Sequence, residues 1–187
     1  MLRRLIIVAC LITATNTFAQ QAAIPPSKTT EKQAGASIDY TQMGAPMPAL
    51  LLIPFFNNVK RVTSSKASFT NADFDNGANL FVMMFSPTCS HCQDETMRIE
   101  KNFALFKKSK LVLLANMINK PYLDDFVKAV NLNGYPSIYL GLDSMGFINN
   151  TYLYQALPQI NIYNSDRKLI KTYTGEVAID SLKKYIE

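Results

Sequence analysis

An unbroken apolar run that leads directly into a pair of cysteines is the feature that most constrains the fold. Residues Leu80–Phe85 are all apolar, the pattern of a strand buried on both faces of a sheet. Leu111–Leu114 predicts a second buried strand. Between them, apolar side chains at helical spacing predict one continuous helical face, made of Cys92, Thr96, Ile99, Phe103 and Phe106. Strand, helix and strand in this order indicate an α/β fold.

Further patterns extend this arrangement at both ends. Ala49–Ile53 and Val59–Thr63 flank two asparagines and predict an N-terminal β-hairpin. Beyond the second buried strand we expect three helices, over Pro121–Val130, Phe147–Leu153 and Val177–Ile186. We also expect a strand over Ser137–Leu140 and a hairpin of two strands, Gln159–Tyr163 and Lys168–Thr174. The sequence therefore predicts a central mixed β-sheet with helices on both faces.

The N-terminus has the layout of a secretory signal peptide. A short basic start precedes ten apolar residues, Leu5–Ala14, and Thr17-Phe-Ala19 forms a small-x-small pattern before Gln20. We therefore expect a signal peptide over 1–19, a flexible linker over 20–42 and one folded domain over 43–187, exported to the periplasm. Ile7-Val-Ala-Cys10 resembles a lipoprotein lipobox, but the apolar stretch before it is short, so lipidation of Cys10 is the less favoured interpretation.

Composition excludes several classes of protein. The chain has 187 residues, 18% charged, with a formal net charge of +5 and scattered lysines, so we expect no nucleic-acid partner. It contains one His and three Cys, which leaves too few ligands for a multi-histidine metal site or a disulfide-stapled mini-domain. We expect no cofactor and no bound metal, and we expect a monomer.

The chemistry is carried by Cys89-Ser-His-Cys92, which follows the first buried strand and opens a helix. Unpaired backbone N–H groups and the helix dipole favour an anion at a helix N-terminus, so a thiolate at Cys89 is stabilised there. Cys92, one turn further on, is placed to attack a mixed disulfide formed at Cys89. The spacing predicts a nucleophilic, exposed Cys89, a buried resolving Cys92 and a reversible disulfide between them.

The motif, its position, and Leu157-Pro158 before a late strand resemble the thioredoxin fold. In its segment Gly44–Leu50 and its acid Glu95, the chain resembles exported thiol-disulfide oxidoreductases of the TlpA/ResA type. The resemblance covers about residues 43–187 and implies a thioredoxin-like fold with an N-terminal hairpin extension and one inserted βα unit. It also implies a cis Pro158 facing the cysteine pair, a substrate strand docked at Leu157, and protein thiols or disulfides as substrates.

Two further residues have a structural and a functional interpretation. Glu95 lies near the start of the helix, where acids are favourable, and the resemblance implies a proton acceptor or charge that tunes the cysteines. A buried Asp of cytosolic thioredoxins is replaced by Met83, which makes Glu95 the leading substitute. His91, between the cysteines, is either a solvent-facing linker residue or a group that stabilises the thiolate and raises the reduction potential.

Other functions compete with disulfide reduction. Gln93 follows Cys92 where haem attachment requires His, which excludes that function, and three clustered ligands disfavour a closed zinc site. Cu(I) bound by the two thiolates gives a metallochaperone alternative. A disulfide-forming oxidase is the other alternative. The stretch from Cys92 to Pro158 is filled by expected strands and helices, with no room for an added helical domain, which favours a reductase. The redox partner is not identified by the sequence.

Overall fold

The computed structural model describes residues 37–55, 67–132, 135 and 137–187, and Ser37–Glu187 form one compact unit. The expected signal peptide over 1–19, Cys10, the expected linker up to residue 36 and the expected strand Val59–Thr63 lie outside the described residues. The described end of the linker is exposed except for the half-buried Tyr40, and backbone hydrogen bonds to β7 (Leu169–Thr174) begin at Gly44.

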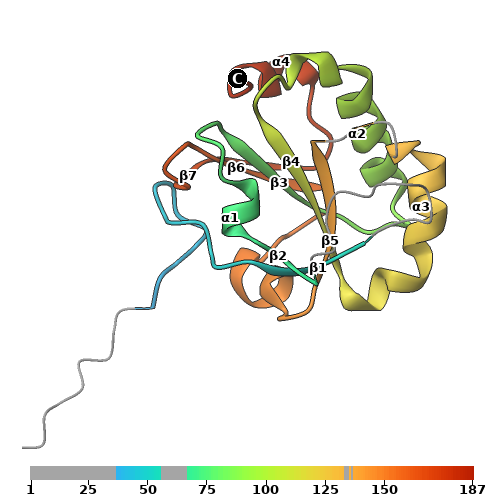
Figure 1. Ribbon diagram of the computed structural model, residues 1–187, viewed down its shortest axis with the longest axis horizontal. Coiled ribbons are helices and arrows are strands. Elements are labelled where there is room, and N and C mark those ends of the chain that lie inside the picture. Colours follow the sequence, from blue (N-terminus) through green and yellow to red (C-terminus); the bar gives the residue numbers. More distant parts are fainter. Residues whose placement is uncertain (1–36, 56–66, 133–134, 136) are drawn as a thin grey trace, which may run out of the picture. The chain divides into compact units, whose positions relative to one another are not determined.

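The core of the domain is a seven-stranded mixed sheet, ordered β2-β1-β5-β4-β3-β6-β7 (Figure 1). The three central strands β3, β4 and β5 are mutually parallel, and every other pairing is antiparallel. The remaining strand bounds are Leu51–Pro54 (β1), Phe69–Thr70 (β2), Leu80–Met84 (β3), Lys110–Asn116 (β4), Ile138–Asp143 (β5) and Gln159–Tyr163 (β6). The expected mixed sheet, with its central and C-terminal strands, is confirmed.

Helical segments cover both faces of the sheet, as expected. On one face β3 and β4 pack against residues of α2 (Ser90–Lys101), α3 (Leu123–Ala129) and α4 (Ile179–Lys183). On the other face they pack against α1 (Asn71–Phe74) and a π-helix over Ile148–Tyr152. In Figure 1, α2 and α3 lie on one side of the sheet and α1 on the other. Every residue of β3 is buried, which agrees with its continuous apolar sequence.

The length predicted for the helix after the cysteines is wrong, because the helix ends before Phe103 and Phe106. α2 ends at Lys101, because Asn102 leaves the helical conformation and its side-chain Nδ2 donates to the carbonyl of Arg98. The chain then forms a 3₁₀ turn over Phe103–Leu105. Phe103 and Phe106 still meet, with ring centroids 6.1 Å apart. The apolar spacing was thus a correct guide to which side chains share the core, and an incorrect guide to the backbone.

Other boundaries also differ from the expected ones. The helix expected from Pro121 begins as a 3₁₀ segment over Met117–Tyr122 and becomes α3 only at Leu123. The last helix, α4, covers Ile179–Lys183 alone. At the N-terminal edge β1 pairs antiparallel with β2, two residues that the sequence did not mark as a strand. β1 also pairs with β5, so this extension is part of the main sheet.

Glu100, in the last turn of α2, is 7% exposed, and its Oε1 accepts no hydrogen bond from the described residues. Burial raises the pKa of Glu100 to about 7 from an ordinary 4.5. A folded-state pKa above the unfolded one means that the folded protein holds this proton more tightly. Its contribution to stability is therefore complete below pH 4.5 and is lost as the pH rises through about 7.

We predict that Glu100→Gln removes this pH dependence, because the amide occupies the same space without ionising. Urea unfolding measures the free energy of unfolding at pH ~5 and at pH ~8. From the lower to the higher pH, this free energy should fall on the order of 2 kcal/mol more in wild type than in the variant. Asp94→Asn, which neutralises an exposed acid on the same helix, should keep the wild-type difference. An equal pH dependence in wild type and Glu100→Gln would contradict the prediction.

Candidate active site

Cys89 occupies the N-cap of α2, directly beyond the end of the buried strand β3. Its Sγ accepts the backbone N–H of Cys92 at 3.3 Å, the bond that a Ser or Asp side chain makes at a helix start. The intervening loop is held by Gln93, whose side-chain Nε2 donates to the carbonyl of Pro87 at 2.8 Å. Cys89 is half-buried, and both cysteines are free thiols. The N-cap therefore presents this sulfur to the surface and to peptide N–H groups together.

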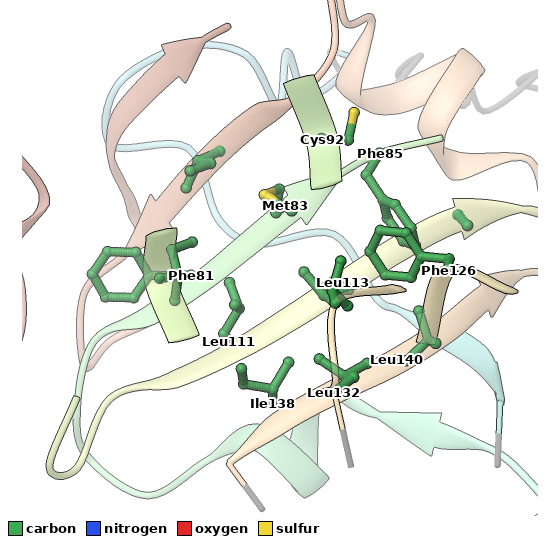
Figure 2. Close-up of a cluster of buried hydrophobic side chains, with 14 of the residues drawn as sticks. Phe81, Met83, Phe85, Cys92, Leu111, Leu113, Phe126, Leu132, Ile138 and Leu140 are labelled. Atoms are coloured by element: carbon green, nitrogen blue, oxygen red, sulfur yellow. The ribbon is translucent and has the colours of Figure 1, made fainter. Parts of the chain in front are cut away.

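Cys92 is fully buried and belongs to the core cluster on the α2 face of the sheet. Figure 2 shows it beside Met83 and Phe85. Burial, followed by a hydrogen bond with the Cys89 side chain, raises the pKa of the Cys92 thiol to about 12. The two cysteines thus differ in environment: Cys92 is buried, as predicted, whereas Cys89, which was expected to be exposed, is half-buried and packs against the edge of the same cluster.

Leu157 and Pro158 precede the first residue of β6, and the peptide bond between them is cis, as expected. Gln159 pairs with Met84, the last residue of β3, so Pro158 lies at the sheet edge from which the cysteine motif emerges. The Pro158 carbonyl accepts the N–H of Gly175 at 2.8 Å. The sheet register therefore brings two distant predicted elements, the cysteine motif and Leu157-Pro158, to one edge of the domain.

Glu95 is completely buried, one turn after Cys92 on the core-facing side of α2. Its Oε2 accepts the N–H of Val177 at 2.9 Å and also a hydrogen bond from Arg98 Nη1. Its Oε1 accepts no hydrogen bond from the described residues. Burial raises the pKa of Glu95, against the opposing effects of the Val177 N–H and of Arg98. A buried acid with one unsatisfied oxygen is able to accept a proton.

Arg98 and Glu176 extend this acid into a chain of charged groups. Arg98 Nη2 donates to Glu176 Oε2 at 2.6 Å, and the other Glu176 oxygen lies 2.6 Å from His91 Nδ1. The hydrogen bond from Arg98, then that from His91, lower the pKa of the Glu176 carboxyl. The chain runs from buried Glu95 to His91, whose side chain is 67% exposed, so it connects the interior to the rim of the cysteine motif.

Four of the polar and thiol groups at this site were selected as candidates from the sequence, and two, Arg98 and Glu176, were missed. These are Cys89, Cys92, Glu95 and His91; for His91 the sequence left a solvent-facing and a thiolate-stabilising interpretation open, and its side chain is exposed and contacts Glu176. Arg98 was detectable as an i,i+3 partner of Glu95. Glu176 carries no local signal, because it comes from the segment between β7 and α4, 85 residues after His91.

Among the described residues, no group of three or more His, Cys, Asp or Glu side chains is arranged to hold a metal ion. The Cu(I) alternative needs only two thiolates and therefore stays a prediction. Within the same part of the chain, no helix has the length and apolarity needed to cross a membrane.

Solved structures provide the comparison with known proteins. StoA from Bacillus subtilis is 19% identical, covers 77% of this chain and 99% of its own, and has a TM-score of 0.57. The thioredoxin domain of a thiol-disulfide oxidoreductase from Bacteroides vulgatus is 16% identical, covers 78% and 99%, and has a TM-score of 0.59. The fold is thioredoxin-like.

A secreted Mycobacterium tuberculosis disulfide oxidoreductase shares this thioredoxin-like fold as well. It is 22% identical and covers 65% of this chain and 88% of its own, with a TM-score of 0.52. No protein-family model matches the sequence, and a search of curated proteins finds no match. At these identities the likeness establishes the fold, and the chemistry has to be argued from the residues of this chain.

We predict that the two thiols differ strongly in reactivity, because Cys92 is buried as a thiol and Cys89 is accessible at a helix start. In a Cys10→Ser background, Cys92→Ser leaves Cys89 alone, and Cys89→Ser leaves Cys92 alone. Iodoacetamide alkylation near neutral pH, followed by mass spectrometry, should be roughly tenfold or more faster for Cys89. Faster alkylation of Cys92 would contradict this assignment.

The matched control for this prediction is the same pair of variants in guanidinium chloride. Unfolding removes both the helix N-terminus and the buried environment, so the two thiols should then react at similar rates. A difference that persisted in the unfolded proteins would have its origin in the local sequence.

Proposed function

We propose that the protein is an exported thiol-disulfide oxidoreductase that reduces protein disulfides through Cys89 and Cys92. The observation that carries the proposal is the asymmetry of the pair, with one sulfur accessible at the N-cap of α2 and the other buried one turn further on. Thiol–disulfide exchange needs such an order of events, because a single attacking sulfur must be followed by a resolving one.

In the first step, the Cys89 thiolate attacks one sulfur of a substrate disulfide. The substrate S–S bond breaks, a Cys89–substrate mixed disulfide forms, and the other substrate sulfur leaves as a thiolate that takes a proton from water. The N-cap favours this step, because the peptide N–H of Cys92, which would stabilise a thiolate, already points at the Cys89 Sγ. Leu157 and Pro158, at the same sheet edge, are the proposed docking position for the extended substrate.

In the second step, Cys92 must lose its proton before it can attack Cys89. Its pKa of about 12 makes ionisation into bulk water unfavourable near neutral pH, so an internal acceptor is needed. Glu95 is the proposed acceptor, since it follows Cys92 on the buried side of α2 and its Oε1 is unsatisfied. The Cys92 thiolate then attacks Cys89, the mixed disulfide breaks, and the second substrate sulfur leaves. The substrate has gained two electrons and the cysteine pair is a disulfide.

Reduction is the proposed direction, with a dithiol partner outside this chain returning the pair to thiols. The described residues between Cys92 and Pro158 form the remainder of α2, two strands, α3 and short helical turns, and hold no additional helical domain. An exported location follows from the N-terminal pattern over residues 1–19 and is in keeping with the secreted mycobacterial protein of similar fold. Protein disulfides are the proposed substrates, with the protein acting as a monomer.

Insulin reduction coupled to dithiothreitol tests the proposed activity. Wild type should accelerate precipitation of the insulin B chain, and Cys89→Ser should reduce the rate to the uncatalysed one. Cys92→Ser should instead accumulate a mixed disulfide with insulin, visible by non-reducing mass spectrometry. The control Cys10→Ser should match wild type. Undiminished turnover by Cys89→Ser would exclude the proposed mechanism.

His91 is proposed to raise the reduction potential of the pair, because it stands between the cysteines in the sequence and its Nδ1 lies 2.6 Å from Glu176. We therefore expect His91→Ala to lower the reduction potential, by about 30 mV for each tenfold loss in the stability of the dithiol relative to the disulfide. Equilibration with glutathione buffers and counting of labelled thiols by mass spectrometry measures it, since the chain has no Trp to report by fluorescence. An unchanged or higher reduction potential in His91→Ala would show that His91 is a surface residue that does not raise the potential of the cysteine pair.

A further inference from the structure

The segment between β7 and α4 joins the separate parts of the site through three consecutive residues. Gly175 donates its N–H to the Pro158 carbonyl at 2.8 Å. Glu176 bonds Arg98 and His91 at 2.6 Å each, and Val177 donates its N–H to Glu95 at 2.9 Å. This segment therefore contacts the proposed docking position, the cysteine motif and the proposed proton acceptor.

Glu176 occupies the middle of this segment and is the only one of the three whose side chain carries charge. It holds Arg98 from the outside, while Glu95 holds the same guanidinium from the inside. Among the described residues, the charged groups that act on Glu95 are Arg98 from its own helix and Glu176 from this segment. Those that act on Glu176 are Arg98 and His91. One cation is thus shared between a buried and a half-exposed carboxylate.

We propose that Glu176 is a positioning residue that sets the pH range in which Cys92 resolves the mixed disulfide, by orienting and partly neutralising the guanidinium that faces Glu95. The proposal rests on the function argued above, with Glu95 as the acceptor of the Cys92 proton. Glu176 itself does not touch the reacting sulfurs. It acts through Arg98, because an arginine already paired on its outer side is a weaker counter-charge for the acid on its inner side.

The sign of the effect follows from these contacts. The negative charge of Glu176 raises the pKa of Glu95, and the positive charge of Arg98 lowers it. Replacing Glu176 with Gln removes the first influence while an amide oxygen is still available to accept from Arg98. Glu95 should then be ionised at lower pH, and the resolving step should persist further into the acid range. Replacing Arg98 with Met should have the opposite effect.

Reaction with Ellman's reagent separates the two steps in a Cys10→Ser background. Release of the first thionitrobenzoate reports attack by Cys89 and depends on reagent concentration. Release of the second reports attack by Cys92 on the mixed disulfide and does not. The acid limb is the range of low pH in which the rate of the second phase falls. We expect Glu176→Gln to move this limb to lower pH, so that within it the second phase is severalfold faster than in wild type. Arg98→Met should move it to higher pH.

Two control variants distinguish this effect from a structural or general electrostatic one. Glu176→Asp keeps the charge and should restore a profile close to wild type. Asp94→Asn makes the same change in net charge at an exposed position next to Glu95 in the sequence, and should leave the profile unchanged. Thermal unfolding of each variant checks that the fold is retained, which we expect because Glu176 is half-exposed.

The outcomes also separate this proposal from the function on which it rests. A second phase that is missing in wild type, or present in Cys92→Ser, would overturn the exchange mechanism itself. If wild type shows both phases and Glu95→Gln abolishes the acid limb, the exchange mechanism stands. A Glu176→Gln profile that then coincides with wild type, or lies at higher pH, would overturn the role of Glu176 alone.

Discussion

The junction between a fully buried strand and the first turn of a helix is the constraint on which the rest of this structure depends. β3 is buried along its whole length, and the chain that leaves it at Met84 reaches the N-cap of α2 at Cys89 after one short loop. Cys89 is the residue at that cap, and its sulfur and its carbonyl oxygen both accept the backbone N–H of Cys92 in the first turn. The same turn directs Cys92 back into the core beside β3. One backbone arrangement therefore produces two sulfurs with opposite properties.

Sequence patterns were reliable where they reported burial and local order. The continuous apolar runs located β3 and β4, and Gln159–Tyr163 was identified with its actual bounds. The cysteine spacing and its place after a strand predicted that Cys92 is the more buried of the two, because helix geometry relates positions three apart. Such features depend on neighbours along the chain, which a single sequence displays directly.

Features that depend on individual side-chain bonds or on distant segments were not accessible in this way. The end of α2 depends on a bond from Asn102 to a carbonyl one turn earlier, and the apolar spacing continues unchanged past it. β2 is two residues long and is defined by its pairing with β1 rather than by its own composition. Glu176 is an ordinary surface acid in the sequence, and only the return of the chain beside α2 gives it partners. This part of the site is formed by contacts between segments that are distant in the sequence, and no local sequence pattern predicts it.

The chain of charged groups that ends at Glu95 bears on the proposed role of this buried acid as a proton acceptor. A buried carboxyl with no counter-charge stays protonated to a higher pH, as burial alone does for Glu100, and a protonated carboxyl accepts no further proton. A carboxylate fully paired with an arginine would be too weak a base to take one from a thiol. Here the guanidinium is divided between Glu95 and Glu176, and only one oxygen of Glu95 is engaged. Burial raises the pKa of Glu95 and the shared guanidinium lowers it. The carboxyl is therefore neither an unpartnered buried acid nor one fully paired with an arginine.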